Sequence, residues 1–187
     1  MDKKQRIIDA AIQLYLKNGI EKTTISHIVK EAGIAQGTFY LYFPTKLAVM
    51  PAIAEQMVAT VHEKLMQIDR NATIREKMLN CINILFSNTN TYQELTKLIY
   101  TGFTQTEEVK QWEKIYSPLY AWVFEVIEEA QSNDEVDGKL DAKVVARIII
   151  GAIESTAEQI YLFDDSPITQ VEHVKDNLLR FILNGLN

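Results

Sequence analysis

The sequence of 187 residues contains a single cysteine, Cys81, and only three histidines, seven glycines and four prolines. One cysteine cannot form an internal disulfide, and Cys81 lies in the apolar segment MLNCINILF, so we interpret it as a small buried side chain in a reducing compartment. His27, His62 and His173 are far apart in the sequence, and no cysteine stands near them at metal-site spacing. We therefore expect no disulfide and no bound metal.

Long apolar runs are also absent. No run approaches the roughly 18 to 20 residues that a membrane-spanning helix needs. The N-terminal segment MDKKQRIIDAA has no apolar core of signal-peptide length. With 47% hydrophobic and 24% charged residues, the composition is that of an ordinary globular protein with enough apolar residues for a core. We expect a cytoplasmic protein that does not span a membrane.

The fingerprints of enzymes are missing as well. The sequence contains no pairing of nucleophile and base, no phosphate-binding loop and no cofactor-binding motif that we can identify. We therefore expect that the protein is not an enzyme and binds no cofactor.

Charge is unevenly distributed along the chain. Residues 1–50 contain seven basic and four acidic residues, a net charge of +3, whereas residues 51–187 contain 12 basic and 21 acidic residues, a net charge of −9. This difference indicates that the basic N-terminal part faces an anion, although a solvated helix surface would also explain it.

Helical spacing of apolar residues dominates the whole chain, and no segment alternates with a period of two. The sequence predicts an all-α protein of about nine helices. The first helix carries Ile7, Ala11, Leu14 and Tyr15 and stops before Gly19, the second runs from a Thr23 or Thr24 cap to Gly33, and the third covers about Gln36 to Phe43. Further helices are expected near residues 45–68, 74–88, 91–103, 107–131, 141–163 and 167–184, with Pro44 in the first turn of the fourth helix.

The segment GIAQGTFYLYFPTK, residues 33–46, concentrates four aromatic residues within five positions. On a helix, Phe39 and Phe43 share one face and Gly37, Thr38 and Leu41 the opposite one, with Tyr40 and Tyr42 on its flanks. Two short helices joined by a tight turn at Gly33 are typical of the helix-turn-helix, whose second helix enters the major groove of DNA. A purely structural helix would not explain why hydroxyl groups surround an exposed glycine.

The segment TTISHIVKEAGIAQGTFYLYFPTK closely resembles the DNA-binding segment of the tetracycline-repressor (TetR) family of bacterial transcription regulators. The resemblance covers about residues 5–50. It implies an N-terminal three-helix DNA-binding domain, residues 1–47, and a helical effector-binding and dimerisation domain, residues 48–187. It also implies that Thr24 contacts phosphate, that Tyr42 and Lys46 grip flanking phosphates, and that four residues approach bases and backbone: Gln36, Gly37, Thr38 and Tyr40.

A row of aromatic residues follows the helix predicted at 107–131, with members four positions apart: Trp112, Tyr116, Tyr120 and Phe124. Pro118 should kink or break this helix near Lys114, and a kink offers a way to open a cavity. The row is therefore the wall of a ligand pocket or plain core. Glu154 and Glu158 in the next helix are either exposed to solvent or face that cavity, where they would favour a cationic ligand.

These features together predict a homodimeric repressor. The resemblance implies pairing through the last two helices and binding to a palindromic double-stranded DNA operator. We expect release from the operator by a small apolar or aromatic effector. The alternative is a constitutive DNA-binding dimer without a small-molecule effector.

Overall fold

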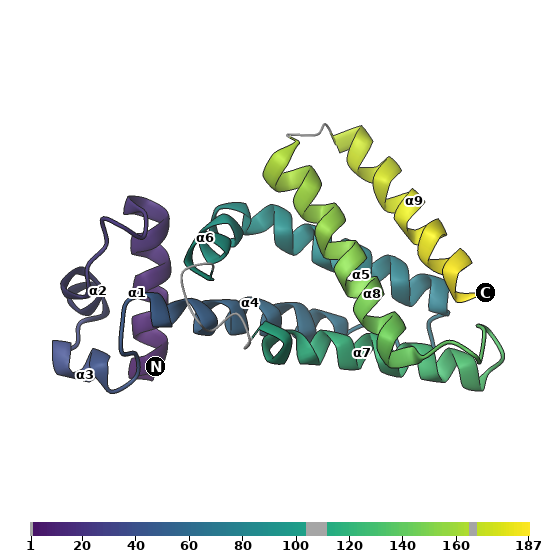
Figure 1. The fold of residues 1–187 in the computed structure, drawn as a ribbon, viewed down its shortest axis with the longest axis horizontal. Coiled ribbons are helices and arrows are strands. Elements are labelled where there is room, and N and C mark those ends of the chain that lie inside the picture. Colours follow the sequence, from purple (N-terminus) through teal and green to yellow (C-terminus); the bar gives the residue numbers. More distant parts are fainter. Residues whose placement is uncertain (1, 104–111, 165–167) are drawn as a thin grey trace. The chain divides into compact units, whose positions relative to one another are not determined.

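A computed structural model of the protein describes residues 2–103, 112–164 and 168–187. Within these ranges the chain forms nine α-helices, a 3₁₀ turn and a π-helical turn, and no strand, so the predicted all-α class is confirmed (Figure 1). The helices are α1 (Lys3–Asn18), α2 (Ile25–Ala32), α3 (Gln36–Tyr40), α4 (Met50–Leu65), α5 (Ile74–Thr91), α6 (Gln93–Phe103), α7 (Trp112–Ser132), α8 (Ala142–Glu158) and α9 (Ile168–Leu186); the two turns are η1 (Leu47–Val49) and η3 (Gln159–Phe163). No helix of this described part is long and apolar enough to cross a lipid bilayer.

The helices belong to two compact units. One contains α1, α2, α3, the first half of α4 and α6, and the other contains the rest of α4, α5, most of α7, α8 and α9. The expected division into residues 1–47 and 48–187 concerns function and stays a prediction.

The turn between α2 and α3 depends on capping at both ends of α2. Thr24 is the N-cap, and its hydroxyl oxygen accepts a hydrogen bond from the backbone N–H of His27. Gly33 ends the helix in the left-handed conformation with φ of 62°, which glycine adopts without the clash that a Cβ atom causes. The chain can therefore enter α3 within three residues, and α2 packs against both α1 and α3.

The division of the aromatic residues in residues 33–46 is confirmed. Phe39 and Phe43 are buried and in contact, with ring centroids 5.9 Å apart, whereas Tyr40, Leu41 and Tyr42 are exposed. The burial of the two phenylalanines attaches this face of the segment to the core of its unit.

The prediction that Pro44 opens the fourth helix is wrong. The helix α4 begins at Met50, and a short 3₁₀ turn at Leu47–Val49 precedes it. The hydroxyl of Thr45 accepts a hydrogen bond from the backbone N–H of Ala48, so the helical path starts after Thr45. Pro51 then takes the early helical position where a missing N–H costs nothing.

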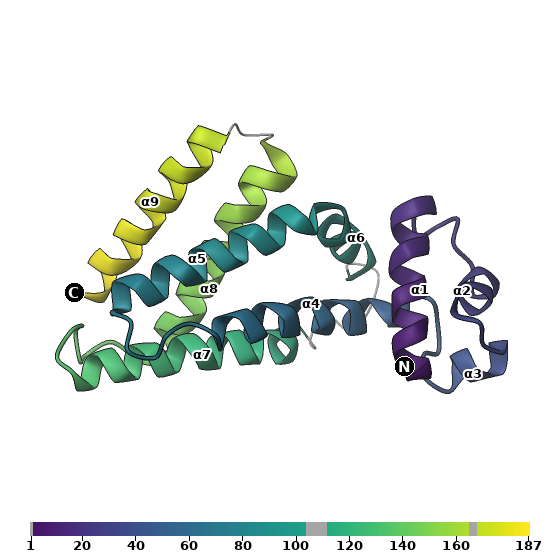
Figure 2. The ribbon, with the colours of Figure 1, turned by 180° about the vertical axis from the view of Figure 1, so that it is seen from behind.

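In the second unit, α5 packs against α8 and α9 (Figure 2). Apolar side chains of these helices form its core, among them Ile82, Phe86, Ile153 and Leu179. Pro118 does not break α7, which is continuous from Trp112 to Ser132. The residues predicted as helical at 107–111 lie outside the described part of the chain.

Two glycines of residues 33–46 should respond in opposite ways to substitution. The Gly33→Ala variant forces a Cβ atom into the left-handed conformation and should lose about 1–2 kcal/mol of unfolding free energy. The Gly37→Ala variant lies in α3, where a Cβ atom meets nothing, and should be neutral or up to about 1 kcal/mol more stable. Urea unfolding followed by circular dichroism measures both, and equal stabilities would contradict this account of the turn.

Candidate DNA-binding face and interior ligand site

The outward face of α3 presents the residues that the sequence predicted for base contacts. Gln36, Gly37 and Tyr40 are exposed and Thr38 is half-buried. A Cβ atom at Gly37 would meet no neighbour within 4 Å, so the backbone is uncovered there. The face therefore combines a bare backbone with an amide and two hydroxyl groups, which are the groups that proteins use to contact base edges and phosphates.

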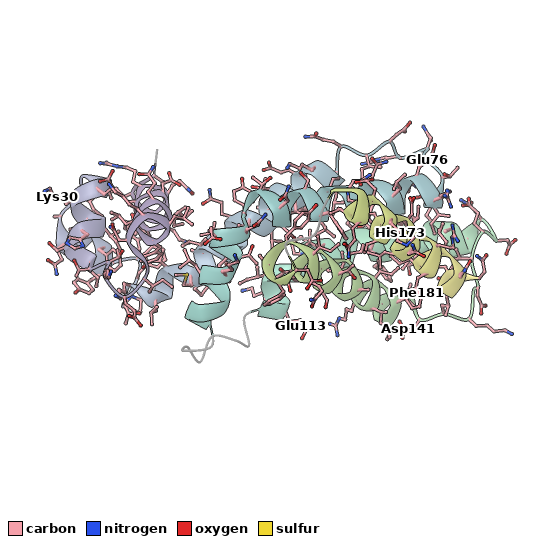
Figure 3. All side chains as sticks on the ribbon, turned by 90° about the horizontal axis from the view of Figure 1, so that it is seen from above. Lys30, Glu76, Glu113, Asp141, His173 and Phe181 are labelled. Atoms are coloured by element: carbon pink, nitrogen blue, oxygen red, sulfur yellow. The ribbon has the colours of Figure 1, made fainter. Side chains whose placement is uncertain are left out.

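Thr24 lies at the start of α2 and is exposed. Its hydroxyl oxygen accepts from the backbone N–H of His27, and a side-chain nitrogen of His27 accepts from the backbone N–H of Thr24 at 3.4 Å. Because an accepting hydroxyl keeps its own hydrogen, Thr24 can still donate to a phosphate oxygen. Lys30, on the last turn of the same helix, adds an exposed positive charge (Figure 3).

Tyr42 is exposed with its hydroxyl available for the predicted phosphate contact, but Lys46 is held differently. The ammonium of Lys46 donates to three backbone carbonyls, those of Ile20, Glu21 and Thr23. The predicted phosphate contact of Lys46 stays a prediction, and in this structure its N–H groups are directed into the protein.

The helix α1 contacts the helix-turn-helix through two side chains: Arg6, for which the sequence predicted no role, and Tyr15, which it predicted only as part of an apolar face. The Arg6 guanidinium donates to the carbonyl oxygen of Gly33 at 3.0 Å, and the Tyr15 hydroxyl donates to the carbonyl oxygen of Lys46 at 2.6 Å. Burial raises the pKa of Tyr15 well above its usual range, so the hydroxyl keeps its hydrogen for this bond. These bonds reach over 27 and 31 residues, and periodicity carries no signal for contacts between side chains and such distant carbonyls.

In the second unit, the aromatic row of α7 lies against α8. The Arg147 guanidinium lies 5.8 Å from the ring centroid of Tyr120, and the Lys143 ammonium lies 5.9 Å from that of Phe124. A step of four residues along α8 thus matches a step of four in the opposite direction along α7. Tyr116 continues the row, its ring centroid 6.1 Å from that of Tyr120.

Glu154 of α8 contacts the aromatic row of α7 at Tyr116. Its carboxylate accepts a hydrogen bond from the side chain of Tyr116, and the residue is half-buried with its carboxyl group surrounded by protein. Loss of hydration raises the pKa of Glu154 to about 8; the Tyr116 hydrogen bond lowers this pKa, and the nearby charge of Glu158 raises it. The carboxyl group is therefore mostly neutral at pH 7. Of the two readings of Glu154, the interior one fits the structure better than full exposure to solvent.

Four of the six predicted ligand-site residues interact with one another. Tyr116 contacts both Tyr120 and Glu154, and the charge of Glu158 acts on Glu154. Phe124 lies one turn further along the row. Trp112 is the first residue of α7, and its side chain lies outside the described part. The ligand pocket itself stays a prediction. Two clefts of this unit, of about 270 and 340 Å³, are lined by other residues, among them Arg70, Lys77 and Glu129.

The buried carboxyl group predicts a pH dependence of stability. Because the pKa of Glu154 is about 8 in the folded protein and near 4.5 in the unfolded chain, the folded state binds more protons between these pH values. The free energy of unfolding should therefore fall as pH rises from 4.5 to 8, by up to about 1.4 kcal/mol per pH unit from this group. The Glu154→Gln variant should lack this contribution and gain stability relative to the wild type as pH rises. Urea unfolding at pH 5 and pH 8 compares the two proteins, and parallel pH dependences would show that Glu154 is solvated.

Comparison with known proteins places this geometry in a family. Residues 7–53 match the model for bacterial regulatory proteins of the tetR family, and residues 78–186 match that for the tetracyclin repressor-like C-terminal domain. The uncharacterised HTH-type transcriptional regulator YvdT of Bacillus subtilis is 36% identical over 189 residues, which cover 98% of this chain and 95% of the relative. The fatty acid metabolism regulator protein of the same organism is 26% identical, over 99% of this chain and 96% of the relative.

A solved structure shows the same fold over nearly the whole chain. The crystal structure of the transcriptional regulator FadR from Bacillus subtilis, in complex with stearoyl-CoA, superposes with a TM-score of 0.78 and 24% identity, covering 98% of this chain and 99% of that one. With its helix-turn-helix, its all-helical second unit and these similarities along the whole sequence, the chain belongs to the TetR family of DNA-binding transcriptional regulators, a family of regulators and not of enzymes.

Proposed function

We propose that the protein is a homodimeric repressor that binds a palindromic operator through residues 23–46 of each subunit and leaves it when a small ligand binds. The observation that carries the DNA-binding part is the exposed face of α3, where an uncovered Gly37 backbone stands beside Gln36, Thr38 and Tyr40. The two buried phenylalanines behind this face hold it rigidly, so the polar groups meet DNA with little loss of conformational freedom.

Sequence preference would come from few side chains. The amide of Gln36 can form paired hydrogen bonds with adenine, and Thr38 can contact a base edge or a thymine methyl group. Thr24 and Tyr42 would contact phosphates on either side and set the register without reading sequence. We propose the same roles for them as the family resemblance implies.

Dimerisation would use the exposed faces of α8 and α9. Ile148 on α8 is 59% exposed and Phe181 on α9 is 69% exposed, which is unusual for large apolar side chains (Figure 3 labels Phe181). Gly151 lies one turn beyond Ile148, with open space where a Cβ atom would stand, so a second helix can approach closely. A two-fold symmetric pair of these faces fits the two-fold symmetry of a palindromic operator.

The dimer is tested by placing a charge on this face. Ile148 is exposed in the single chain, so the Ile148→Asp variant should fold, yet it should run as a monomer in analytical ultracentrifugation at micromolar concentration. It should also lose the preference of the wild type for its own promoter over random duplex at physiological salt. Asn83→Asp places the same charge on the exposed side of α5 and should leave both properties unchanged. A monomeric wild type would contradict the proposed dimer. Equal binding of the promoter and of random duplex by the wild type would contradict the proposed sequence-specific DNA binding.

The ligand would lie along the aromatic row of α7. Tyr116, Tyr120 and Phe124 offer ring faces, and the mostly neutral Glu154 adds a hydrogen-bonding group without a full buried charge. Such a wall suits an apolar or aromatic molecule with few polar groups. A fatty acyl-CoA is the second candidate, because the chain is similar over nearly its whole length to a fatty acid metabolism regulator and to FadR in complex with stearoyl-CoA.

A ligand changes operator binding only if it binds the DNA-competent and DNA-incompetent states unequally. Operator release should therefore be measured with a panel of apolar and aromatic compounds and, separately, with stearoyl-CoA. For a compound that releases the wild type, Tyr120→Ala should raise the concentration needed at least tenfold, while operator affinity without ligand stays close to that of the wild type. Phe163→Ala removes an exposed aromatic ring outside the row and serves as the control.

Two outcomes would contradict the ligand proposal. If Tyr120→Ala responds like the wild type, the aromatic row is core and the ligand lies elsewhere. If neither the apolar and aromatic compounds nor stearoyl-CoA release the wild type from its operator, the alternative of a constitutive DNA-binding dimer replaces the ligand-responsive repressor.

A further inference from the structure

Lys46 is the last residue of the segment that resembles the family's DNA-binding unit, and its ammonium is fully occupied by protein. The side-chain nitrogen lies 2.7 Å from the carbonyl oxygen of Ile20, 3.1 Å from that of Glu21 and 2.8 Å from that of Thr23. An ammonium has three N–H donors, so these three bonds use all of them. Hydrogen bonds from a charged donor are also stronger than bonds between neutral groups.

The three carbonyls lie in the turn between α1 and α2, directly before the N-cap Thr24. From the other side, the backbone carbonyl of Lys46 accepts the hydrogen bond of the buried Tyr15 hydroxyl. Lys46 thus ties three segments of one unit together: the turn before α2, the chain after α3 and the helix α1.

We propose that Lys46 is a positioning residue for DNA binding: it fixes the turn at residues 20–23, and through it the start of α2, and makes no phosphate contact. This inference rests on the proposed DNA-binding function. Because Thr24 follows the turn directly, any shift of the turn moves the N-terminus of α2 and the helix-turn-helix that begins there.

A second side chain holds the same turn without any charge. The buried hydroxyl of Thr23 lies 3.2 Å from the carbonyl oxygen of Leu14 and 2.8 Å from that of Gly19. Thr23 has no surface from which to contact DNA, so its removal separates an effect on the turn from an effect on phosphate binding. Valine has nearly the same shape as threonine and lacks only the hydroxyl group.

The test measures operator affinity at several salt concentrations for the wild type, Lys46→Met and Thr23→Val, at a temperature where circular dichroism shows all three folded. Each Lys–phosphate contact contributes about 0.9 to the slope of log affinity against log salt concentration. A positioning role predicts that both variants lose about tenfold or more in affinity, with the slope of the wild type retained. A phosphate contact in each subunit predicts instead that Lys46→Met alone reduces the slope by about 1.8.

Lys139→Met, at an exposed lysine of the second unit, is the matched control for loss of a charge and should keep the operator affinity and salt slope of the wild type. The inference is overturned if Lys46→Met reduces the slope as a phosphate contact does, or if Thr23→Val binds the operator like the wild type. If Lys46→Met fails to fold, Lys46→Gln takes its place in the same comparison, because an amide still donates hydrogen bonds to carbonyl oxygens but carries no charge to contribute to the salt slope. Failure of the wild type to prefer its promoter would refute the proposed function, and that result is distinct from a changed slope in a wild type that binds.

Discussion

A helix of five residues has too few internal hydrogen bonds to be stable by itself, and α3 is such a helix. Its position must come from its surroundings. Phe39 and Phe43 bury one face, and the left-handed Gly33 starts the turn that leads into it. Arg6 holds the carbonyl oxygen of Gly33, and Tyr15 holds the carbonyl oxygen of Lys46. The proposed DNA-binding face is therefore fixed by contacts at both ends and behind it, while its front is exposed.

The second unit contains a different constraint, the burial of a carboxyl group. Charged carboxylates are costly to bury, so Glu154 shifts its pKa upward and shares a hydrogen bond with Tyr116. Cys81 of α5 is also buried: burial, and to a lesser extent the proximity of Glu154, raise the pKa of its thiol to about 12, so it stays protonated and unreactive at neutral pH. The ionised form of the Glu154 carboxyl group is therefore disfavoured in the folded protein, which is why the free energy of unfolding should depend on pH.

Much of the fold could be predicted from the sequence, because helical periodicity and caps are local signals. The start of α2 at Thr23 or Thr24, its end at Gly33, the inward phenylalanines and the exposed Gly37 all follow from residues within one or two turns, and the structure decides for Thr24 as the cap. The start of α4 could not be predicted from Pro44, because the next seven residues offer other start signals. Thr45 accepts a hydrogen bond from the Ala48 N–H, and Pro51 suits the first turn of the helix that begins at Met50. The four-residue spacing predicted the aromatic row of α7. Its partners could not be predicted from this spacing, because Lys143, Arg147 and Glu154 belong to another helix, α8. The bonds of Arg6, Tyr15 and Lys46 to distant carbonyls leave no pattern in the sequence, because almost any backbone carbonyl can serve as acceptor.

The central claim is that the uncovered face of α3 reads DNA while side chains behind it keep their bonds to the protein backbone. The most direct measurement is a structure of the dimer on its operator. The account predicts that the Gly37 backbone lies against the base edges of the major groove, and that the Lys46 nitrogen remains about 3 Å from the carbonyl oxygens of Ile20, Glu21 and Thr23. A structure in which α3 lies outside the groove, or in which Lys46 has left these carbonyls for a phosphate, would contradict it.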